Sequence, residues 1–311
     1  MPEFNDEIWK RSIHTLFRPM VGFHFPDLHP LIDWSREPAF LEEELANLFD
    51  PKKEGKRFVD ILAQIFLLDG TEKYILLHVE VQGYGSGEEA TLEFEERMFE
   101  YYYRVRDKWK VKDIAALAIL TDGNPKYRPD RYETSFFGTT LTYVFNVSKI
   151  IDYDDKELEE NSNPFATLML AAKRALKVER SDDETKKLFK IALLRLGIAK
   201  DYTAKELEAL FYFVDWVVAF SGVKARNEFV GEVRAMAKKE EIHMPYVTSI
   251  EEVTREETRE ATRIETIAET KLEMASTMLE AGEPDVKILA YAKISREELT
   301  QLKKRLGQEA R

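Results

Sequence analysis

The stretch from Phe58 to Gln82 constrains the fold most, because it contains two apolar runs joined by a turn signal. The second run alternates between apolar odd positions, from Ile75 to Val81, and more polar even positions that end in His78, Glu80 and Gln82. A repeat of two residues is typical of a β-strand with two different faces. The Asp69-Gly70 pair between the runs is a hairpin signal. The sequence therefore predicts an antiparallel β-hairpin.

Two acids of this hairpin are candidates for one site. Asp60 is the single carboxylate in the apolar start of the first run, where an unpaired charge would be costly to bury. Residues opposed in an antiparallel ladder project to the same face. We predict a register in which Asp60 lies opposite Glu80 and residues 69–71 form a three-residue loop. A two-residue Asp69-Gly70 turn would instead place the acids on opposite faces.

The side chains of Asp60, Glu80 and Gln82 on one face would suit a hard cation. Mg²⁺ takes oxygen ligands and keeps several waters, so it can activate water and stabilise charge on a phosphate. The alternative is an ordinary amphipathic hairpin whose polar face lies in solvent. The pattern of the hairpin alone favours this alternative over a metal site.

Composition narrows the classes of function. The chain of 311 residues has a formal charge of −12, no cysteine and five histidines. The lack of cysteine excludes disulfides and thiolate chemistry, and the histidines show no zinc-protease spacing. There is no apolar run long enough to cross a membrane, and the first residues do not resemble a signal peptide, so we expect a cytoplasmic protein without membrane contact. The acidic charge argues mildly against bulk nucleic-acid binding but does not exclude a nuclease.

The region before the hairpin predicts two helices. The first has an apolar face from Ile8 to Phe17 and ends at Pro19. The second begins near Ser35, a candidate N-cap, and carries a core stripe of leucines at positions 41, 45 and 48. Among its acids, Glu44 is expected nearest the buried edge and could point toward the hairpin. A solvated acidic face that complements the helix dipole is the alternative.

The region after the hairpin predicts a long helix over residues 88–110, followed by strands over 114–120 and 141–151. The carboxyl end of this helix is rich in basic residues, among them Arg104, which suits either a solvated helix end or a nucleic-acid contact. The predicted order from residue 35 onward is α, β, β, α, β, β. This order indicates an α/β fold with a mixed sheet.

The rest of the chain predicts helices. Apolar stripes at helical spacing mark residues 164–176, 183–196, 204–220 and 227–239. A charged helix over 249–282 and two short helices, 285–292 and 295–306, follow, and Ser295 and Glu298 have the spacing of a capping box. We therefore divide the chain into an α/β domain over 1–153, a helical domain over 154–248 and a C-terminal part over 249–311. The long charged helix favours a homodimer through the C-terminal helices.

Several of these segments resemble one known family. Asp60, the HVEVQG stretch of residues 78–83 and the ERMFEYYYRVRD stretch of residues 96–107 are similar to the recombination-promoting nuclease (Rpn) and transposase family, a branch of the PD-(D/E)XK nuclease superfamily. The resemblance extends to residues 8–20, 40–45, 117–123 and 278–302, so it covers most of the chain.

The resemblance implies a restriction-endonuclease-like core, with helices on both faces of a mixed sheet, followed by an all-helical part. It implies that Asp60 and Glu80 bind Mg²⁺ or Mn²⁺, with assistance from Glu44. Gln82 stands where the superfamily pattern has lysine, and a glutamine offers only a neutral donor and acceptor. Lys56 or Arg57 could supply the missing positive charge.

The function that follows is magnesium-dependent endonuclease cleavage of a DNA phosphodiester, a hydrolase reaction of the kind used in DNA recombination. In this hypothesis Gln82 positions the nucleophile or a ligand water, and Arg97, Arg104 and Lys56 contact the DNA backbone. The alternative is a catalytically inactive nuclease fold that acts as a DNA- or protein-binding module. The net acidity and the missing lysine favour that alternative.

Overall fold

The computed structural model describes residues 2–46, 48, 59–80, 88–178, 181–241, 270–279 and 281–309. Within these ranges the side chains of residues 2–6, 59, 60, 80, 88–90, 223, 286 and 304–309 lie outside the description. The chain forms two compact units, Met1–Tyr246 and Val247–Arg311.

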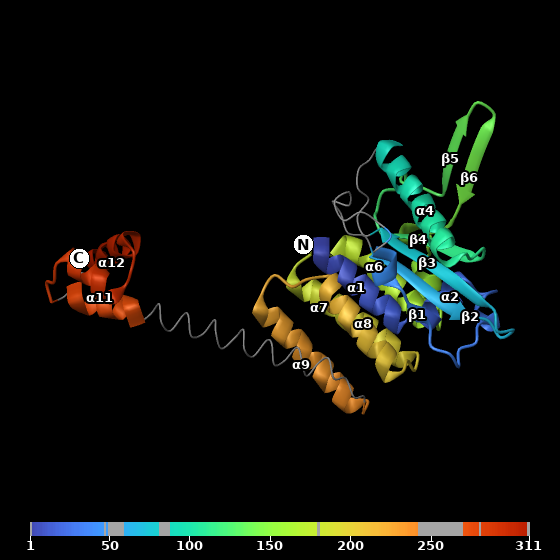
Figure 1. Ribbon diagram of the computed structural model, residues 1–311. Coiled ribbons are helices and arrows are strands. Elements are labelled where there is room, and N and C mark those ends of the chain that lie inside the picture. The colour runs from blue at the N-terminus through green and yellow to red at the C-terminus, as the bar shows by residue number, and fades with distance from the viewer. Residues whose placement is uncertain are drawn as a thin grey trace. The chain divides into compact units, whose positions relative to one another are not determined.

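A mixed sheet of five strands lies at the centre of the first unit (Figure 1). Its order is β1-β2-β3-β4-β7, with bounds Ala39–Phe40, Val59–Phe66, Glu72–Glu80, Ile114–Leu120 and Asn146–Lys149. The pairs β1-β2 and β2-β3 are antiparallel, whereas β3-β4 and β4-β7 are parallel. The helix α4 (Glu88–Trp109) provides the crossover between β3 and β4. The predicted hairpin, long helix and α/β class with a mixed sheet are confirmed.

The register of the hairpin differs from the predicted one by two residues. Asp60 pairs with His78, not with Glu80, and the three-residue loop consists of residues 68–70. Gly70 has a φ of +83°, so it takes the left-handed last position of that loop. The prediction was wrong because it placed Gly70 in the middle of the loop. Successive residues of a strand point to opposite faces, so a shift of two residues leaves each residue on its original face. Positions 60 and 80 therefore still fall on the same face.

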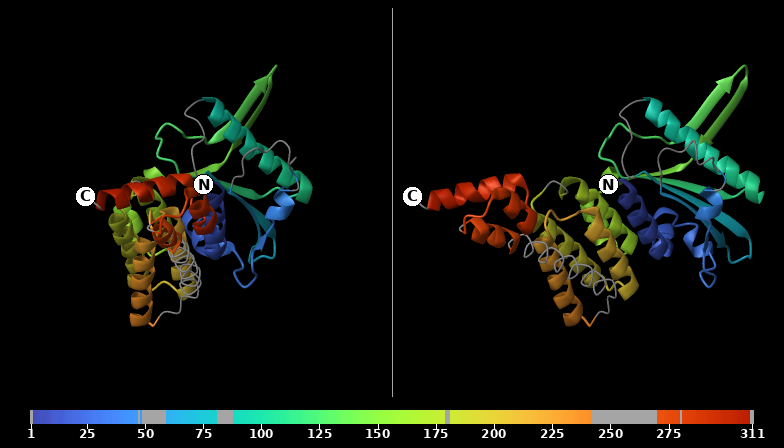
Figure 2. Two further views of the ribbon diagram at one scale, coloured as in Figure 1. Left: turned by 90° about the vertical axis from the view of Figure 1, so that its left-hand side faces the viewer. Right: turned by 60° about the vertical axis from the view of Figure 1, so that its left-hand side comes forward.

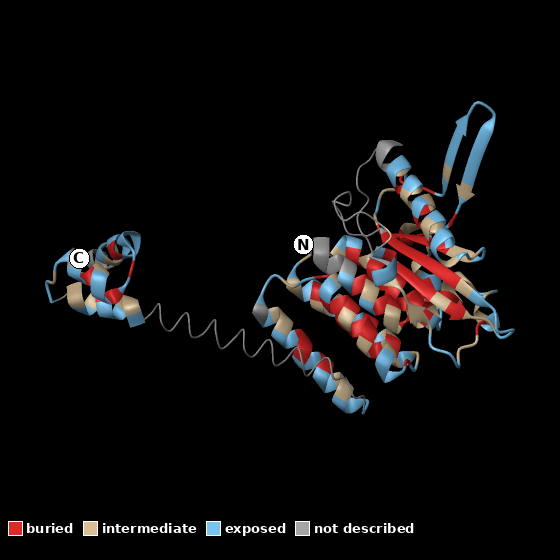
Figure 3. Ribbon diagram, in the orientation of Figure 1, coloured by how far each residue is buried: buried red, intermediate tan, exposed pale blue. Residues whose placement is uncertain are grey.

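Both faces of the hairpin are buried (Figure 3). The odd positions of β3, such as Ile75 and Val79, are fully buried, and α1 packs against β2. The even positions form a core with α4. That core contains Leu62, Tyr74, Leu76, Ala118 and Leu120 of the sheet and Phe94, Met98, Tyr101 and Val105 of α4. The alternative of a polar face in solvent is therefore wrong along this part of β3.

The N-terminal helices have different bounds from those expected. The helix α1 spans Pro2–Thr15, and α2 spans Phe17–His24 with Pro19 in its first turn, where a proline costs no helical hydrogen bond. The predicted helix start at Ser35 is wrong, because Ser35 makes a turn with the Asp33 carboxylate. Ala39–Phe40 pair with β2 as β1, and α3 spans only Glu42–Ala46.

The strand predicted over residues 141–151 is two strands in different sheets. An exposed hairpin of β5 (Arg131–Phe136) and β6 (Thr139–Val144) forms a separate two-stranded sheet, and β7 begins after Phe145. Phe145 is buried in the core under α4, which separates the two pairing partners. The 3₁₀ turns η1 (His29–Leu31) and η2 (Ile150–Asp152) complete the irregular segments.

Helices make up the remainder of the first unit, as predicted. They are α5 (Asp155–Glu160), α6 (Pro164–Val178), α7 (Asp183–Ala199), α8 (Ala204–Val217) and α9 (Val223–Lys239). The helix α1 packs against α8, where the Trp9 and Phe213 rings lie 4.9 Å apart in an edge arrangement. The helical region and the sheet region consequently belong to one compact unit.

In the second unit, residues 270–279 are helical, followed by α11 (Asp285–Ala292) and α12 (Arg296–Glu309). The capping box is confirmed, since the Ser295 N–H donates to Glu298 at 2.6 Å and the Glu298 N–H donates to Ser295 Oγ at 3.2 Å. Ala275, Ile288, Ala292, Ile294 and Leu299 form its small core. Most of the predicted charged helix over 249–282 falls outside the described residues. Among the described helices, none has the length and apolar character that crossing a membrane requires.

The buried imidazole of His24 gives the first testable prediction. Its ring lies 4.9 Å from the Phe23 ring and 5.5 Å from the Phe165 ring, and no described residue hydrogen-bonds its buried Nε2. Burial lowers the pKa of His24 from 6.5 to about 3. Because the unfolded chain then binds more protons below pH 6.5, stability present at neutral pH is lost as the pH falls toward 3.

We expect the His24 contribution to cost about 2 kcal/mol of unfolding free energy at pH 5 relative to pH 7.5. His24→Phe keeps an aromatic ring in the site and should remove that part of the pH dependence. Urea unfolding of both proteins at the two pH values measures the difference. Identical losses in the two proteins would show that His24 stays accessible to protons in the folded state.

Candidate functional site

The carboxyl ends of three neighbouring strands meet at one edge of the sheet. Because β3, β4 and β7 are parallel, Glu80, Leu120 and Lys149 lie in one row across that edge, with Glu80 paired to Leu120 and Leu120 paired to Lys149. Crevices beyond the carboxyl ends of parallel strands are where open α/β sheets bind ligands. The predicted acid at position 80 thus occupies a location that suits a site.

The backbone register brings position 60 to the same region. Asp60 pairs with His78, and position 80 is the next residue of β3 on the same face. Diagonal positions of an antiparallel ladder lie roughly 7–8 Å apart, which two carboxylates can bridge through one cation. Both positions belong to the face that α4 covers, because Leu62 and Leu76 of that face pack against α4.

His78 stands directly opposite Asp60 and is fully buried. Its ring lies 5.0 Å from the Phe94 ring and 6.3 Å from the Tyr101 ring, both on α4. An imidazole within this aromatic layer excludes water from the base of the candidate site. The alternation of polar residues in β3 marked His78, but no sequence signal placed Asp60 opposite His78 rather than opposite Glu80.

Lys149, the last residue of the row formed with Glu80 and Leu120, belongs to an ion pair that was not predicted. The Lys149 ammonium donates a hydrogen bond of 2.5 Å to Asp122 Oδ2, and the two side chains are only 2% and 10% exposed. Asp122 Oδ1 also accepts from the Asn124 N–H at 2.8 Å, so the pair fixes the loop after β4. A lysine at the end of a predicted strand and an aspartate in the adjacent turn were the available signals.

The predicted acid Glu44 is not the most buried acid of α3. Its side chain is exposed, whereas Glu42 of the same helix accepts a hydrogen bond of 2.6 Å from His14 of α1. Burial raises the pKa of Glu42, but the hydrogen bonds from His14 and the backbone, together with the charges of His14 and Lys10, outweigh burial, and the net shift is downward. The expectation that Glu44 lies nearest the buried edge was wrong, because Glu42 takes that position through its contact with His14, which is 28 residues away in the sequence.

The other predicted site residues differ in whether the structure describes them and in what they contact. Gln82, Lys56 and Arg57 lie outside the described residues. Arg97 is partly buried on α4. Arg104 donates to the Leu48 carbonyl and lies 3.4 Å from Glu100, so it ties α4 to the segment after α3. The exposed cations at and just after this end of α4 are Arg106, Lys108, Lys110 and Lys112, and Lys110 lies 2.8 Å from Asp107.

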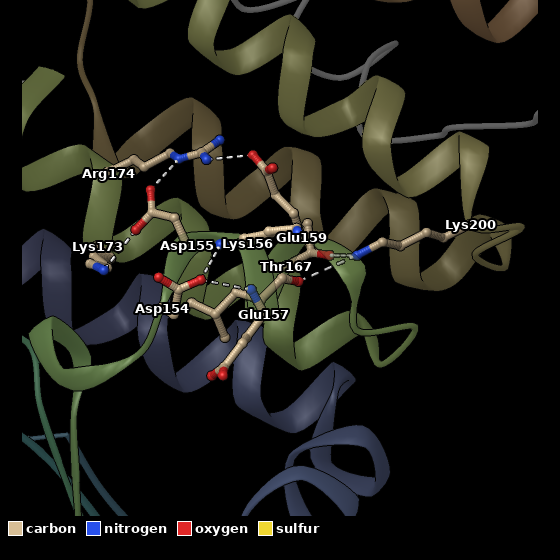
Figure 4. A network of polar contacts seen from close by, with 10 residues as sticks. Asp154, Asp155, Lys156, Glu157, Glu159, Thr167, Lys173, Arg174 and Lys200 are labelled. Carbon is tan, nitrogen blue, oxygen red and sulfur yellow. Dashed lines mark hydrogen bonds and ion pairs between the residues drawn. The ribbon is translucent and has the colours of Figure 1, made fainter.

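A network of charged and polar side chains holds helices together (Figure 4). Asp155 accepts from Arg174 at 2.9 Å and lies 2.7 Å from the Lys173 ammonium, while Lys200 donates to the Asn161 carbonyl at 2.6 Å. These contacts join α5 to α6 and the end of α7, so this network has a structural role. Among the described side chains, no group of three histidines or acids is arranged to hold a metal ion.

We compared the chain with known protein families, curated proteins and solved structures. No family model, no curated protein and no solved structure matches the chain.

The Lys149–Asp122 pair gives a prediction about the edge of the sheet. Lys149→Met leaves the Asp122 carboxylate buried without its cation, which should lower the free energy of unfolding by about 3 kcal/mol. Adding Asp122→Asn removes the charge but keeps an acceptor for the Asn124 N–H, so the double variant should recover part of that loss. Urea denaturation of the four proteins of this cycle measures the coupling. Simple additivity of the two substitutions would contradict a buried, interacting pair.

Proposed function

We propose that the chain is a metal-dependent DNA endonuclease with a restriction-endonuclease-like core, of the type that the Rpn and transposase family represents. The mixed sheet with helices on both sides is compatible with such a core. The observation that carries the proposal is the register, in which positions 60 and 80 share one face at the edge where strands end. A register shifted by one residue would have placed the two positions on opposite faces and ruled out a common site.

The donor set fits Mg²⁺ or Mn²⁺. Asp60 and Glu80 supply hard, anionic oxygens, and the Gln82 amide supplies a neutral one. A divalent cation bound there would lower the pKa of a ligand water and polarise a phosphate oxygen. Asp60 and Glu80 would hold the site in place from two hydrogen-bonded strands, and Gln82 would orient the attacking water.

The positive charge that stabilises the DNA phosphate must come from residues other than Gln82. Gln82 carries no charge, and the buried Lys149 is already paired with Asp122. Lys56, Arg97 and the basic carboxyl end of α4 are the cations that this proposal assigns to the DNA backbone. Contacts of this kind release counterions, so DNA binding should weaken as salt is raised.

A catalytically inactive nuclease fold is the second candidate, and one observation favours it. Glutamine replaces the lysine of the superfamily pattern at position 82. Such a protein would bind DNA through the same face without cutting it. Cleavage and binding therefore have to be measured separately.

Plasmid nicking tests the proposal. The purified chain should cut supercoiled DNA with Mg²⁺ or Mn²⁺ and not with EDTA. Asp60→Asn combined with Glu80→Gln keeps the size of both side chains but removes the charges that hold the cation, so cleavage should fall by about 100-fold or more. Glu160→Gln, an exposed acid on α5, is the matched control and should leave the rate unchanged.

Circular dichroism and gel filtration should show that all three proteins are folded. Equal cleavage by the wild type and the double variant would assign the activity to a contaminant or to another site. Absence of cleavage together with salt-dependent DNA binding would support the second candidate instead.

A further inference from the structure

The β5–β6 hairpin projects from the first unit as a two-stranded arm (Figure 2). Its tip consists of Phe136 and Phe137, which are 74% and 95% exposed and lie with ring centroids 4.7 Å apart. Two adjacent phenylalanines that contact each other in solvent contribute little to the core of a folded chain. Large exposed apolar groups of this kind mark interaction sites.

The turn at the tip is strained in a way that folding does not explain. Phe137 has a φ of +45° and Gly138 a φ of +84°, so both central residues of the two-residue loop are left-handed. Such a loop favours Asn or Gly at its first position, whereas a bulky residue there is disfavoured. Strained backbone conformations of this kind are common at functional sites, so Phe137 at the tip indicates a binding role.

The arm is firmly anchored at its base. The Tyr132 ring stacks on Phe99 of α4 at 5.2 Å, and the Tyr143 ring lies 4.8 Å from Tyr102 of α4. These contacts come from both strands of the hairpin, so the arm is fixed on the helix that also covers the candidate site. Its direction is set by packing rather than by the turn.

The chemistry of the arm suits a nucleic acid. Apart from Glu133 near its base, the arm contains no acid in a chain of net charge −12, and it carries exposed hydroxyls at Thr134, Ser135, Thr139, Thr140 and Thr142. Hydroxyl side chains commonly donate to phosphate oxygens. The helix α4 adds the exposed cations Arg106 and Lys108 on the element that anchors the arm.

We infer that the β5–β6 hairpin is a DNA-binding arm whose Phe136 and Phe137 insert between base pairs of the duplex. A two-stranded ribbon fits a DNA groove, and apolar wedges on such elements unstack a base step and kink the helix. This inference rests on the proposed function and names its substrate form, a duplex distorted by the protein itself. A second copy of the chain is a less suitable occupant, because an aromatic tip with hydroxyl-rich flanks lacks the broad apolar area of a stable dimer.

The experiment uses the full-length protein in EDTA, so that the DNA stays intact. The probes are short duplexes in which 2-aminopurine replaces one adenine, scanned along the site, together with a fluorescence-anisotropy measurement of affinity. The wild type should raise the 2-aminopurine fluorescence at one or two adjacent positions, because unstacking relieves quenching. Phe136→Ser combined with Phe137→Asn should abolish that rise and weaken binding about 10-fold.

The double substitution also provides its own folding control. Asn-Gly is the favoured pair for this loop, so the variant should melt at the same temperature as the wild type or above it. A merely structural role for the phenylalanines would predict a lower melting temperature. Tyr291→Ser, which changes an exposed aromatic residue on α11 of the second unit, is the matched control and should keep the fluorescence rise.

The outcomes separate the inference from the proposed function. Metal-dependent cleavage by a wild type that causes no 2-aminopurine response would overturn the inference and leave the nuclease proposal intact. A variant that keeps both the response and the affinity would also overturn it. If the substitutions instead convert a dimer to a monomer in sedimentation, the arm binds a second copy and the inference is wrong. Failure of the wild type to bind DNA under any condition would refute both.

Discussion

The burial of β3 on both faces is the constraint on which the rest of the first unit depends. Its odd positions, Ile75, Leu77 and Val79, are fully buried, and its even positions lie beneath α4. A strand buried on both faces cannot slip by one residue without moving apolar groups and His78 onto the wrong sides. The register of the hairpin is therefore strongly determined, and with it the face on which positions 60 and 80 lie.

The same packing explains why polar groups gather at one edge. Along most of β3 the even face is occupied by Tyr74 and Leu76, and only toward its carboxyl end do His78 and Glu80 follow. The parallel strands β4 and β7 end beside it with Asp122 and Lys149, whose ion pair satisfies two charges that would otherwise be costly to bury. The apolar core of this face thus gives way to polar residues at the edge where the parallel strands end.

Much of the fold could be predicted because local patterns agreed with tertiary packing. The helix α4 and the helices of the later region were placed within a few residues, and the Ser295 capping box was recognised from its spacing. The failures have tertiary causes. Ala39–Phe40 form a strand only because β2 offers a free edge, and residues 141–151 divide because Phe145 turns into the core between two sheets.

The sequence allowed us to predict that positions 60 and 80 share one face, but not which residues contact them. The choice of a three-residue loop over a two-residue Asp69-Gly70 turn correctly placed positions 60 and 80 on one face, whereas the exact partner of Asp60 depended on the conformation of Gly70. Glu44 was misplaced because the cover that α1 provides for Glu42 is a long-range contact. The Lys149–Asp122 pair joins residues 27 positions apart and becomes visible only when β4 and β7 are aligned.

The measurement that tests the central claim most directly is anomalous diffraction from crystals of the protein soaked in Mn²⁺. A metal site on the shared face of β2 and β3 requires one anomalous peak within coordination distance of carboxylate oxygens of both Asp60 and Glu80, at roughly 2.0–2.2 Å. The claim would be contradicted if the two carboxylates pointed apart with no peak between them while Mn²⁺ occupied other acids of the same crystal.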